Sequence, residues 1–174
     1  MGEKAAVLVS VVMGSDSDLP VMEEAVRVLA EFAIPHELFL TSAHRSPERT
    51  TAFARGARQR GVRLIIAGAG AAAHLAGAIA AQTPLPVIGV PIDATPLQGL
   101  DALLATVQMP GGIPVATMAI GKAGARNAAL FAVRLLALDD AGLEERLADY
   151  HRKMAQDVER KHEKLSGFLA REGA

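Results

Sequence analysis

Apolar runs alternate with stretches of helical spacing five times along this chain, and this alternation restricts the possible folds more than any other feature. Several of the runs are rich in Val, Ile and Leu, as the strands of a buried parallel sheet are. We expect the strands at residues 5–13, 36–40, 62–67, 87–90 and 115–120. Helical patterns occupy 19–32, 47–60, 97–107 and 123–138, and a further helix is entered from the small-residue segment 68–77. Because no hairpin signal separates two strands, the alternation predicts one α/β domain with a five-stranded parallel, doubly wound sheet.

The composition limits both the core and the possible partners. Apolar residues make up 51% of the 174 residues but aromatic residues only 3%, so the core must be built mainly from closely packed Ala, Val, Leu and Ile. A net charge of −1 without a long basic block argues against a general binder of nucleic acids or membrane surfaces. The absence of cysteine excludes disulfides, Cys-ligated metal centres and thiol catalysis. The amino terminus shows neither a cleavage-site pattern nor a membrane-spanning apolar stretch, so we expect a cytoplasmic protein.

The carboxyl-terminal segment 141–171 differs in kind, because its apolar residues stand at helical spacing among many charges. It predicts one amphipathic helix of up to about 45 Å at about 1.5 Å per residue, which is longer than a small sheet requires. Such a helix packs on its own domain or on a neighbouring subunit. We favour the neighbouring subunit, because an apolar stripe beyond the domain edge would otherwise stay wet. The expected organisation is an α/β domain at 1–140 and a helical extension at 141–174.

Polar residues that the fold needs least gather in three loops, each following a predicted strand. The loops are Gly14-Ser15-Asp16-Ser17-Asp18, Ser42-Ala43-His44-Arg45 and the small-residue segment 68–74, which ends in His74. The carboxyl ends of parallel strands meet at one edge of a sheet, so we expect the three loops to converge on one ligand.

The residues of the first two loops suit a phosphorylated sugar. Arg45 offers a charged fork beside the hydroxyls of Ser15 and Ser42, a combination typical of phosphate binding. Asp16 or Asp18 would accept hydrogen bonds from ribose hydroxyls. The alternative is that Ser15 and Asp18 only cap the following helix, where both residue types are preferred.

His44 is the candidate acid–base residue, because imidazole is the side chain that most readily gives and takes protons near neutral pH. The alternative is a structural histidine. That alternative is stronger for His74, which follows a run of alanines and could brace its own loop.

Two segments suggest other chemistry. Gly121-Lys122 resembles the end of a P-loop, but Ala116 and Ala123 replace its first glycine and its Ser/Thr, so the motif fails. The segment 68–73 is closer to a dinucleotide fingerprint, because it follows a strand, enters a helix and precedes Asp93 at the end of the next strand. A nicotinamide-dependent enzyme therefore remains an alternative, although it leaves the second loop without a role.

Five motifs together resemble the catalytic subunit of phosphoribosylaminoimidazole carboxylase, a family whose bacterial members include N5-carboxyaminoimidazole ribonucleotide mutases. The resemblance covers residues 7–138 and rests on motifs in the family's order: Gly14-Ser15-Asp16-Ser17-Asp18, Ser42-Ala43-His44-Arg45-Ser46-Pro47, 68–77, 108–114 and 119–128. It implies a flavodoxin-like three-layer α/β/α fold with a long C-terminal helix, assembled as a homo-octamer. The implied reaction belongs to de novo purine biosynthesis. In it, the carboxylate of N5-carboxyaminoimidazole ribonucleotide moves from the exocyclic nitrogen to ring carbon C4, without metal, ATP or biotin.

The resemblance also implies roles for individual residues and partners. The family's proposed proton carrier falls on His44. The substrate-binding residues fall on Ser15, Asp18, Ser42, Arg45, Gly70, Ala72, His74 and Leu75. No cofactor is implied. The implied partners are the ribonucleotide, the other subunits and, in function, the ATP-dependent N5-carboxyaminoimidazole ribonucleotide synthetase.

The sequence departs modestly from the family pattern. Ala71 occupies a place often held by glycine, and Ala94-Thr95-Pro96 stands where small hydroxyl residues are common. The form Ser42-Ala43-His44-Arg45 favours the mutase over the relative that carboxylates aminoimidazole ribonucleotide directly with CO2, whose motif tends to carry lysine. Direct carboxylation remains an alternative, as does a nucleotide-sensing module without enzyme activity.

Overall fold

The sheet of this protein is parallel throughout, and its strand order is β2-β1-β3-β4-β5. The computed structural model describes residues 6–172, and the chain divides into two compact units at residue 132. All five strands belong to the first unit: β1 (Val9–Met13), β2 (His36–Leu40), β3 (Leu64–Gly70), β4 (Val87–Ile92) and β5 (Ala116–Thr117). This order is that of flavodoxin-like folds, which confirms the predicted fold class.

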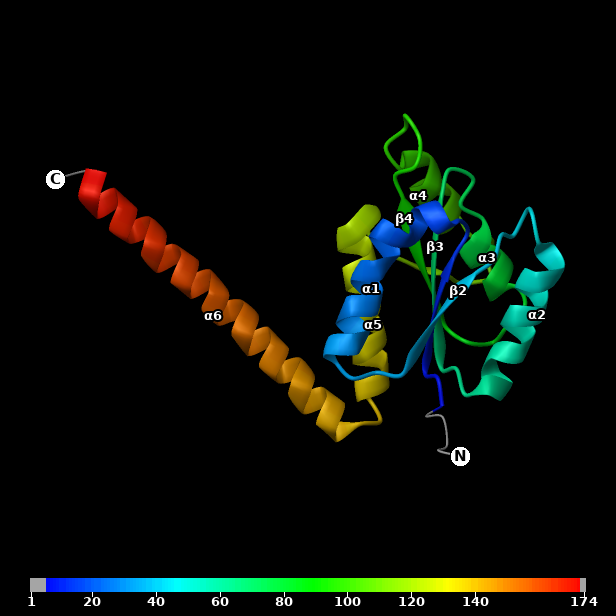
Figure 1. The fold of residues 1–174 in the computed structure, drawn as a ribbon, viewed down its shortest axis with the longest axis horizontal. Coiled ribbons are helices and arrows are strands. Elements are labelled where there is room, and N and C mark those ends of the chain that lie inside the picture. Colours follow the sequence, from blue (N-terminus) through cyan, green and yellow to red (C-terminus); the bar gives the residue numbers. More distant parts are fainter. Residues whose placement is uncertain (1–5, 173–174) are drawn as a thin grey trace. The chain divides into compact units, whose positions relative to one another are not determined.

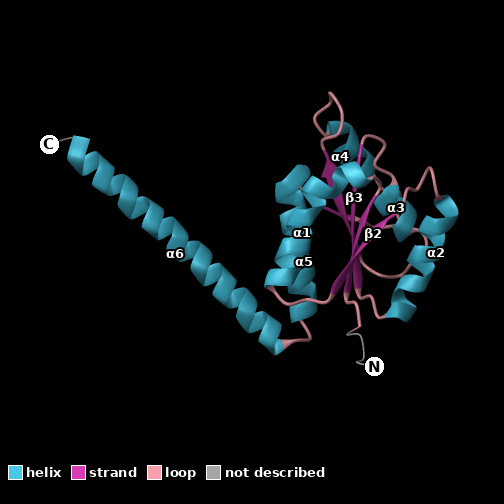
Figure 2. Ribbon diagram, viewed as in Figure 1, coloured by secondary structure: helices cyan, strands magenta, loops and turns pink. Residues whose placement is uncertain are grey.

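Helices cover both faces of the sheet. The helices within residues 6–172 are α1 (Leu19–Glu31), α2 (Pro47–Ala57), α3 (Leu75–Ala80), α4 (Leu100–Val107), α5 (Gly121–Ala137) and α6 (Ala141–Glu172), with short 3₁₀ turns at Asp16–Asp18 and Arg58–Arg60. Figure 1 shows α1 and the first part of α5 on one face and α2 and α3 on the other. The same three layers are clear when the ribbon is coloured by secondary structure (Figure 2).

The core consists mainly of Val, Ile, Leu and Ala, as the composition predicts, with Phe32 and Phe53 as its aromatic members. All five residues of β1 are buried. In the neighbouring central strand, Gly68 of β3 allows close packing, because a Cβ atom there would lie 2.3 Å from the sulfur of Met22 on α1. The small residue therefore lets α1 lie directly on the sheet.

Four predicted strand boundaries are wrong because of strand pairing. Two of them are the start of β3, at Leu64 and not residue 62, and the end of β4, at Ile92 and not residue 90. The first strand begins at Val9 and not at residue 5, which lies outside the described residues, because its ladder with β2 begins opposite His36. The preceding Pro35 has no N–H to donate to a ladder. Conversely, β3 continues to Gly70, beyond the predicted end at residue 67, because β4 supplies partners up to Ile92.

Two further boundaries are set by local backbone geometry and by the sheet edge. The predicted helix at 97–107 begins only at Leu100, because Gln98 (φ 52°) and Gly99 (φ 84°) adopt left-handed conformations that a helix cannot contain. The predicted strand at 115–120 is reduced to the two residues of β5, which pairs with β4 on one side.

The second unit contains the end of α5 and the whole of α6. Asp140 caps α6, since its Oδ1 accepts a hydrogen bond from the backbone N–H of Leu143 at 2.9 Å. Exposed apolar side chains recur along α6 at Met154, Val158 and Leu165. This helix begins where the predicted extension begins, and residues 173–174 of that extension lie outside the described part. Between residues 6 and 172, no helix is both long and apolar enough to cross a membrane.

Candidate active site

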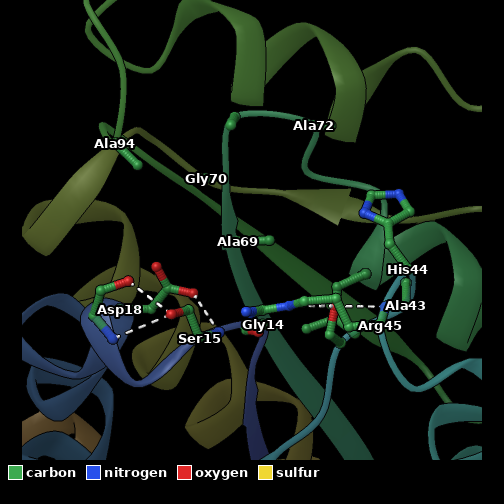
Figure 3. Close-up of a pocket in the computed structure, with 14 residues that line it drawn as sticks. Gly14, Ser15, Asp18, Ala43, His44, Arg45, Ala69, Gly70, Ala72 and Ala94 are labelled. Carbon is green, nitrogen blue, oxygen red and sulfur yellow. Dashed lines mark hydrogen bonds between the residues drawn. The ribbon is translucent and has the colours of Figure 1, made fainter.

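A cavity of about 310 Å³ lies at the carboxyl edge of the sheet, where the loops after β1, β2 and β3 meet (Figure 3). It is at the point where the strand order reverses between β1 and β3, the usual ligand position in such sheets. Its lining comprises Gly14, Ser15, Ser17, Asp18, Ser42, Ala43, His44, Arg45, Ala69, Gly70, Ala71, Ala72, Leu75 and Ala94. The predicted convergence of the three loops is confirmed.

The loop after β1 is held by its own hydrogen bonds. The backbone N–H of Ser15 donates to Asp18 Oδ2 at 3.0 Å, and the Ser15 side chain accepts in return from the backbone of Asp18, which completes a capping box. The Ser17 N–H also donates to Ser15 Oγ, at 3.4 Å. The hydroxyl of Ser17 also donates to Ser15 Oγ at 2.8 Å. The capping role predicted for Ser15 and Asp18 is therefore present, and both residues also line the cavity.

Asp18 is the most buried charged group of this loop, with 5% of its surface exposed. Burial raises the pKa of its carboxyl group, and backbone hydrogen bonds from Ser15 and Gly14 only partly oppose that effect. A ligand hydroxyl that donates to this carboxylate would replace part of the solvation that burial removes.

The loop after β2 is closed by its serines and presents two exposed side chains. Ser42 Oγ accepts from the backbone N–H of Arg45 at 3.1 Å, and the Ser46 N–H donates to the Ser42 carbonyl at 2.9 Å. Arg45 crosses to the first loop, where its Nη2 donates to the carbonyl of Gly14 at 3.1 Å. The Arg45 guanidinium thus joins the two loops and lies at the cavity.

The end of β3 and the segment after it form a tight wall made of small residues. Gly70 has no room for a side chain, because a Cβ atom there would lie 2.5 Å from the Cβ of Ala94. Ala71 has a φ of 51°, in the left-handed region that favours glycine, which explains why glycine suits this position. The Ala73 N–H donates to the Ala71 carbonyl at 2.8 Å and fixes the turn.

His44 and His74 are brought together from loops 30 residues apart. His44 Nε2 lies 2.9 Å from His74 Nδ1, and the two rings meet edge to face at 87° with centroids 5.0 Å apart. His44 is one of the residues that line the cavity. His74 is not one of them, but its side chain contacts His44. Seven of the eight predicted binding residues line the cavity, and His74 is the eighth.

Some lining residues were not among those predicted to bind substrate. The clearest is Ala94, which follows β4 and contacts the cavity beside Gly70. The order of the parallel strands is the signal that could have found it, because β4 ends at the same edge. A second hollow of about 570 Å³ shares Arg45 and Ser42 and extends to Arg49.

The structure also bears on the alternative chemistries. Gly68, Ala69 and Gly70 are residues of β3 and not a glycine-rich loop, and α3 opens only at Leu75, which argues against a dinucleotide fingerprint. Within residues 6–172, no group of three or more His, Asp or Glu side chains is placed to hold a metal ion.

Comparison with known proteins assigns the class. Residues 8–157 match the AIR carboxylase family, and this matched range includes all three loops of the cavity. The chain therefore belongs to this family.

Individual relatives agree with that assignment. The chain is 55% identical over 158 residues to the N5-carboxyaminoimidazole ribonucleotide mutase of Pyrococcus horikoshii, covering 91% of this chain and 88% of that protein. It is 53% identical over 167 residues to the mutase of Mycobacterium tuberculosis, covering 94% and 95% of the two chains. The crystal structure of Treponema denticola PurE superposes with a TM-score of 0.82 at 28% identity, covering 91% of this chain and 98% of that one.

Proposed function

We propose that this protein converts N5-carboxyaminoimidazole ribonucleotide into 4-carboxy-5-aminoimidazole ribonucleotide, a step of purine biosynthesis. The observation that carries the proposal is the cavity, which joins anion-binding groups on two loops to a histidine at its wall. Its volume of about 310 Å³ lies at the lower end of the usual range for small-molecule sites, which suits a mononucleotide.

The ribonucleotide is held by the first two loops. Arg45 and the hydroxyls of Ser15 and Ser42 supply donors for the phosphate. Asp18 accepts hydrogen bonds from the ribose hydroxyls, which compensates its buried charge. The base then extends toward the third loop, where Gly70, Ala72 and Leu75 form the wall.

His44 carries the proton in both halves of the reaction. As the carbamate C–N bond breaks, the electron pair stays on the exocyclic nitrogen, which takes a proton from protonated His44 and leaves aminoimidazole ribonucleotide and CO2. Ring carbon C4 then attacks CO2, and His44 accepts the proton that C4 loses. The histidine returns to its starting state, so the step balances without any other reactant.

The small-residue wall keeps CO2 next to C4 between the two halves. Ala69, Ala71 and Ala72 bring backbone close to the reacting atoms, and no bulky side chain is needed there. A CO2 molecule held in this position reacts as if at a very high concentration, which contributes much of the rate.

The decisive assay supplies N5-carboxyaminoimidazole ribonucleotide without ATP and follows the C4-carboxylated product. Product formation supports the proposal, and its absence contradicts it. A parallel reaction with aminoimidazole ribonucleotide and bicarbonate tests the alternative of direct carboxylation, which predicts efficient turnover in that second mixture. If the fluorescence of NADH does not change when the protein is added, the nicotinamide alternative is rejected.

The assembly that we propose is a homo-octamer in which α6 packs on a neighbouring subunit. Two stripes of exposed apolar side chains support this assembly. One lies on α6, and the other is formed by Leu97, which precedes α4, with Leu100, Leu104 and Val107 of α4. In full-length protein, Val158→Asp should lower the mass measured by light scattering, whereas the equally charged control Gln156→Asp should not. An unchanged mass for Val158→Asp would contradict docking through this stripe.

The remaining proposed partner is the enzyme that supplies the substrate. An ATP-dependent N5-carboxyaminoimidazole ribonucleotide synthetase must make the carbamate that this enzyme consumes. Because a carbamate loses CO2 easily, the two enzymes must share a compartment, and we propose that it is the cytoplasm.

A further inference from the structure

The contact between His44 and His74 restricts where the protons on both rings can be. A hydrogen bond between two imidazole nitrogens needs one N–H donor and one lone-pair acceptor. At 2.9 Å, His44 Nε2 and His74 Nδ1 are within hydrogen-bond distance, and the edge-to-face rings allow an in-plane N–H to point at the other nitrogen. The proton on one ring therefore decides the tautomer of the other.

We infer that His74 accepts this hydrogen bond and thereby makes Nδ1 of His44 the nitrogen that exchanges a proton with the substrate. With His74 protonated at its own Nε2, its Nδ1 lone pair accepts the Nε2–H of His44. His44 Nε2 then keeps its proton throughout. Nδ1 of His44 carries a proton in the acid state and a lone pair in the base state, so the hydrogen bond survives both halves of the reaction.

The placement of the two rings supports this division of roles. Figure 3 shows the His44 ring beside the cavity, with one ring nitrogen on the side of Ala69 and the other turned away. Because Nε2 is occupied by His74, Nδ1 is the nitrogen left for the substrate. His74 acts through His44 and is therefore a positioning residue.

Both rings are carried by fixed backbone. The N–H of His74 donates to the Ala72 carbonyl at 2.8 Å, and its carbonyl accepts from Ala78 at 2.9 Å. On the opposite loop, the turn that carries His44 is closed between Ser42 and Ser46. Two anchored turns thus hold the backbone of both histidines, and the contact forms between their two side chains. The titratable or charged groups that line the cavity with His44 are Asp18 and Arg45.

The hydrogen bond can be tested without any turnover, by ¹⁵N NMR of the full-length protein labelled at its histidine rings. The chain has five histidines, so single variants assign the signals. We expect a proton on His44 Nε2 and a coupling across the hydrogen bond to His74 Nδ1, which disappears in His74→Asn. The control His36→Asn, on β2, should leave it intact. A proton on His74 Nδ1, or no coupling in the wild-type protein, would overturn the inference.

Kinetics test the consequence, which rests on the proposed function. His74→Leu removes the acceptor, and we expect kcat to fall by at least about 10-fold with KM unchanged, less than the ~10²–10⁴ of an acid–base group itself. His74→Asn keeps an acceptor near the position of Nδ1 and should recover most of the loss. A raised KM with normal kcat would indicate substrate contact and overturn the inference, as would wild-type kcat in both variants. If the wild-type protein shows no turnover, the proposed function fails while the NMR result still decides the role of the pair.

Discussion

The loops after β1 and β2 meet at one edge of the sheet but use their polar groups in opposite ways. In the first loop Ser15, Ser17 and Asp18 bond to one another, and Asp18 is almost completely buried. In the second loop His44 and Arg45 are exposed and bond to other loops. The first loop is therefore the more rigid of the two, and in the proposed function it holds the ligand while the second presents the groups that act on it. Substitutions in the first loop should accordingly reduce stability as well as binding, whereas substitutions of His44 and Arg45 should reduce function without a loss of stability.

The largest effect is expected for His44→Asn. We expect its turnover of N5-carboxyaminoimidazole ribonucleotide to fall by at least ~10²-fold, the low end for a general acid–base group, with an unchanged melting temperature. His36→Asn, whose ring bonds to the Ile34 carbonyl, is the control for losing an imidazole elsewhere. A near-normal rate in His44→Asn would remove the proposed proton carrier.

Arg45→Ala should weaken nucleotide binding by about 10- to 100-fold, since a hydrogen bond to a charged group contributes about 1.5–3 kcal/mol. The measurement is the dissociation constant of the product nucleotide by calorimetry. Arg49→Ala removes a neighbouring charge that faces the adjacent hollow, and it should have a smaller effect. If both variants lose the same affinity, nucleotide binding depends only on the positive charge of this region and not on a specific contact with Arg45.

Ser15→Ala tests the rigidity of the first loop. Loss of the cap should lower the free energy of unfolding by about 1 kcal/mol in urea denaturation. Ser17→Ala in the same loop removes a hydroxyl that does not cap, so it serves as the matched control. If both variants lose the same stability, the capping box is not what stabilises the loop.

The smallest effect concerns the pH dependence of stability at Asp18. Burial raises the pKa of this carboxyl group, so the folded protein holds the proton more tightly than the unfolded chain, whose pKa is about 3.9. The stabilisation that protonation provides is complete below the unfolded pKa and is lost as pH rises through the folded pKa.

Relative to the non-titrating variant Asp18→Asn, the wild-type protein should therefore lose free energy of unfolding as pH rises from about 4. Urea denaturation at a series of pH values measures the difference, and Asp16→Asn reports the effect of removing an exposed carboxyl nearby. A wild-type protein that gains stability over Asp18→Asn with rising pH would contradict this account.

The fold was largely predictable, because strand and helix periods differ and the chain alternates between them. The wrong boundaries are those at which a neighbouring strand or a local backbone conformation sets the end of an element. Nothing local indicates that β3 continues to Gly70, since only the length of β4 makes those residues a strand. Similarly, the left-handed turn at Gln98 and Gly99 shortens α4 within an otherwise helical pattern.

The loops of the site were predictable for a different reason, since each polar segment directly follows a strand of a parallel sheet. The contacts between loops were not predictable. His44 and His74 are 30 residues apart, and their contact depends on the geometry of two turns and two side chains. The burial of Asp18 is equally a tertiary property, because the sequence around it is polar.

The central claim is that the carboxylate migrates within one cavity as trapped CO2, with His44 moving the proton. The most direct measurement is the fate of a ¹³C label in the carbamate carboxylate of N5-carboxyaminoimidazole ribonucleotide, in the presence of excess unlabelled bicarbonate and without ATP. The account predicts that the label is retained at the C4 carboxylate of the product in the wild-type enzyme and that His44→Asn forms almost none. A product that carries carbon from the unlabelled bicarbonate would contradict it.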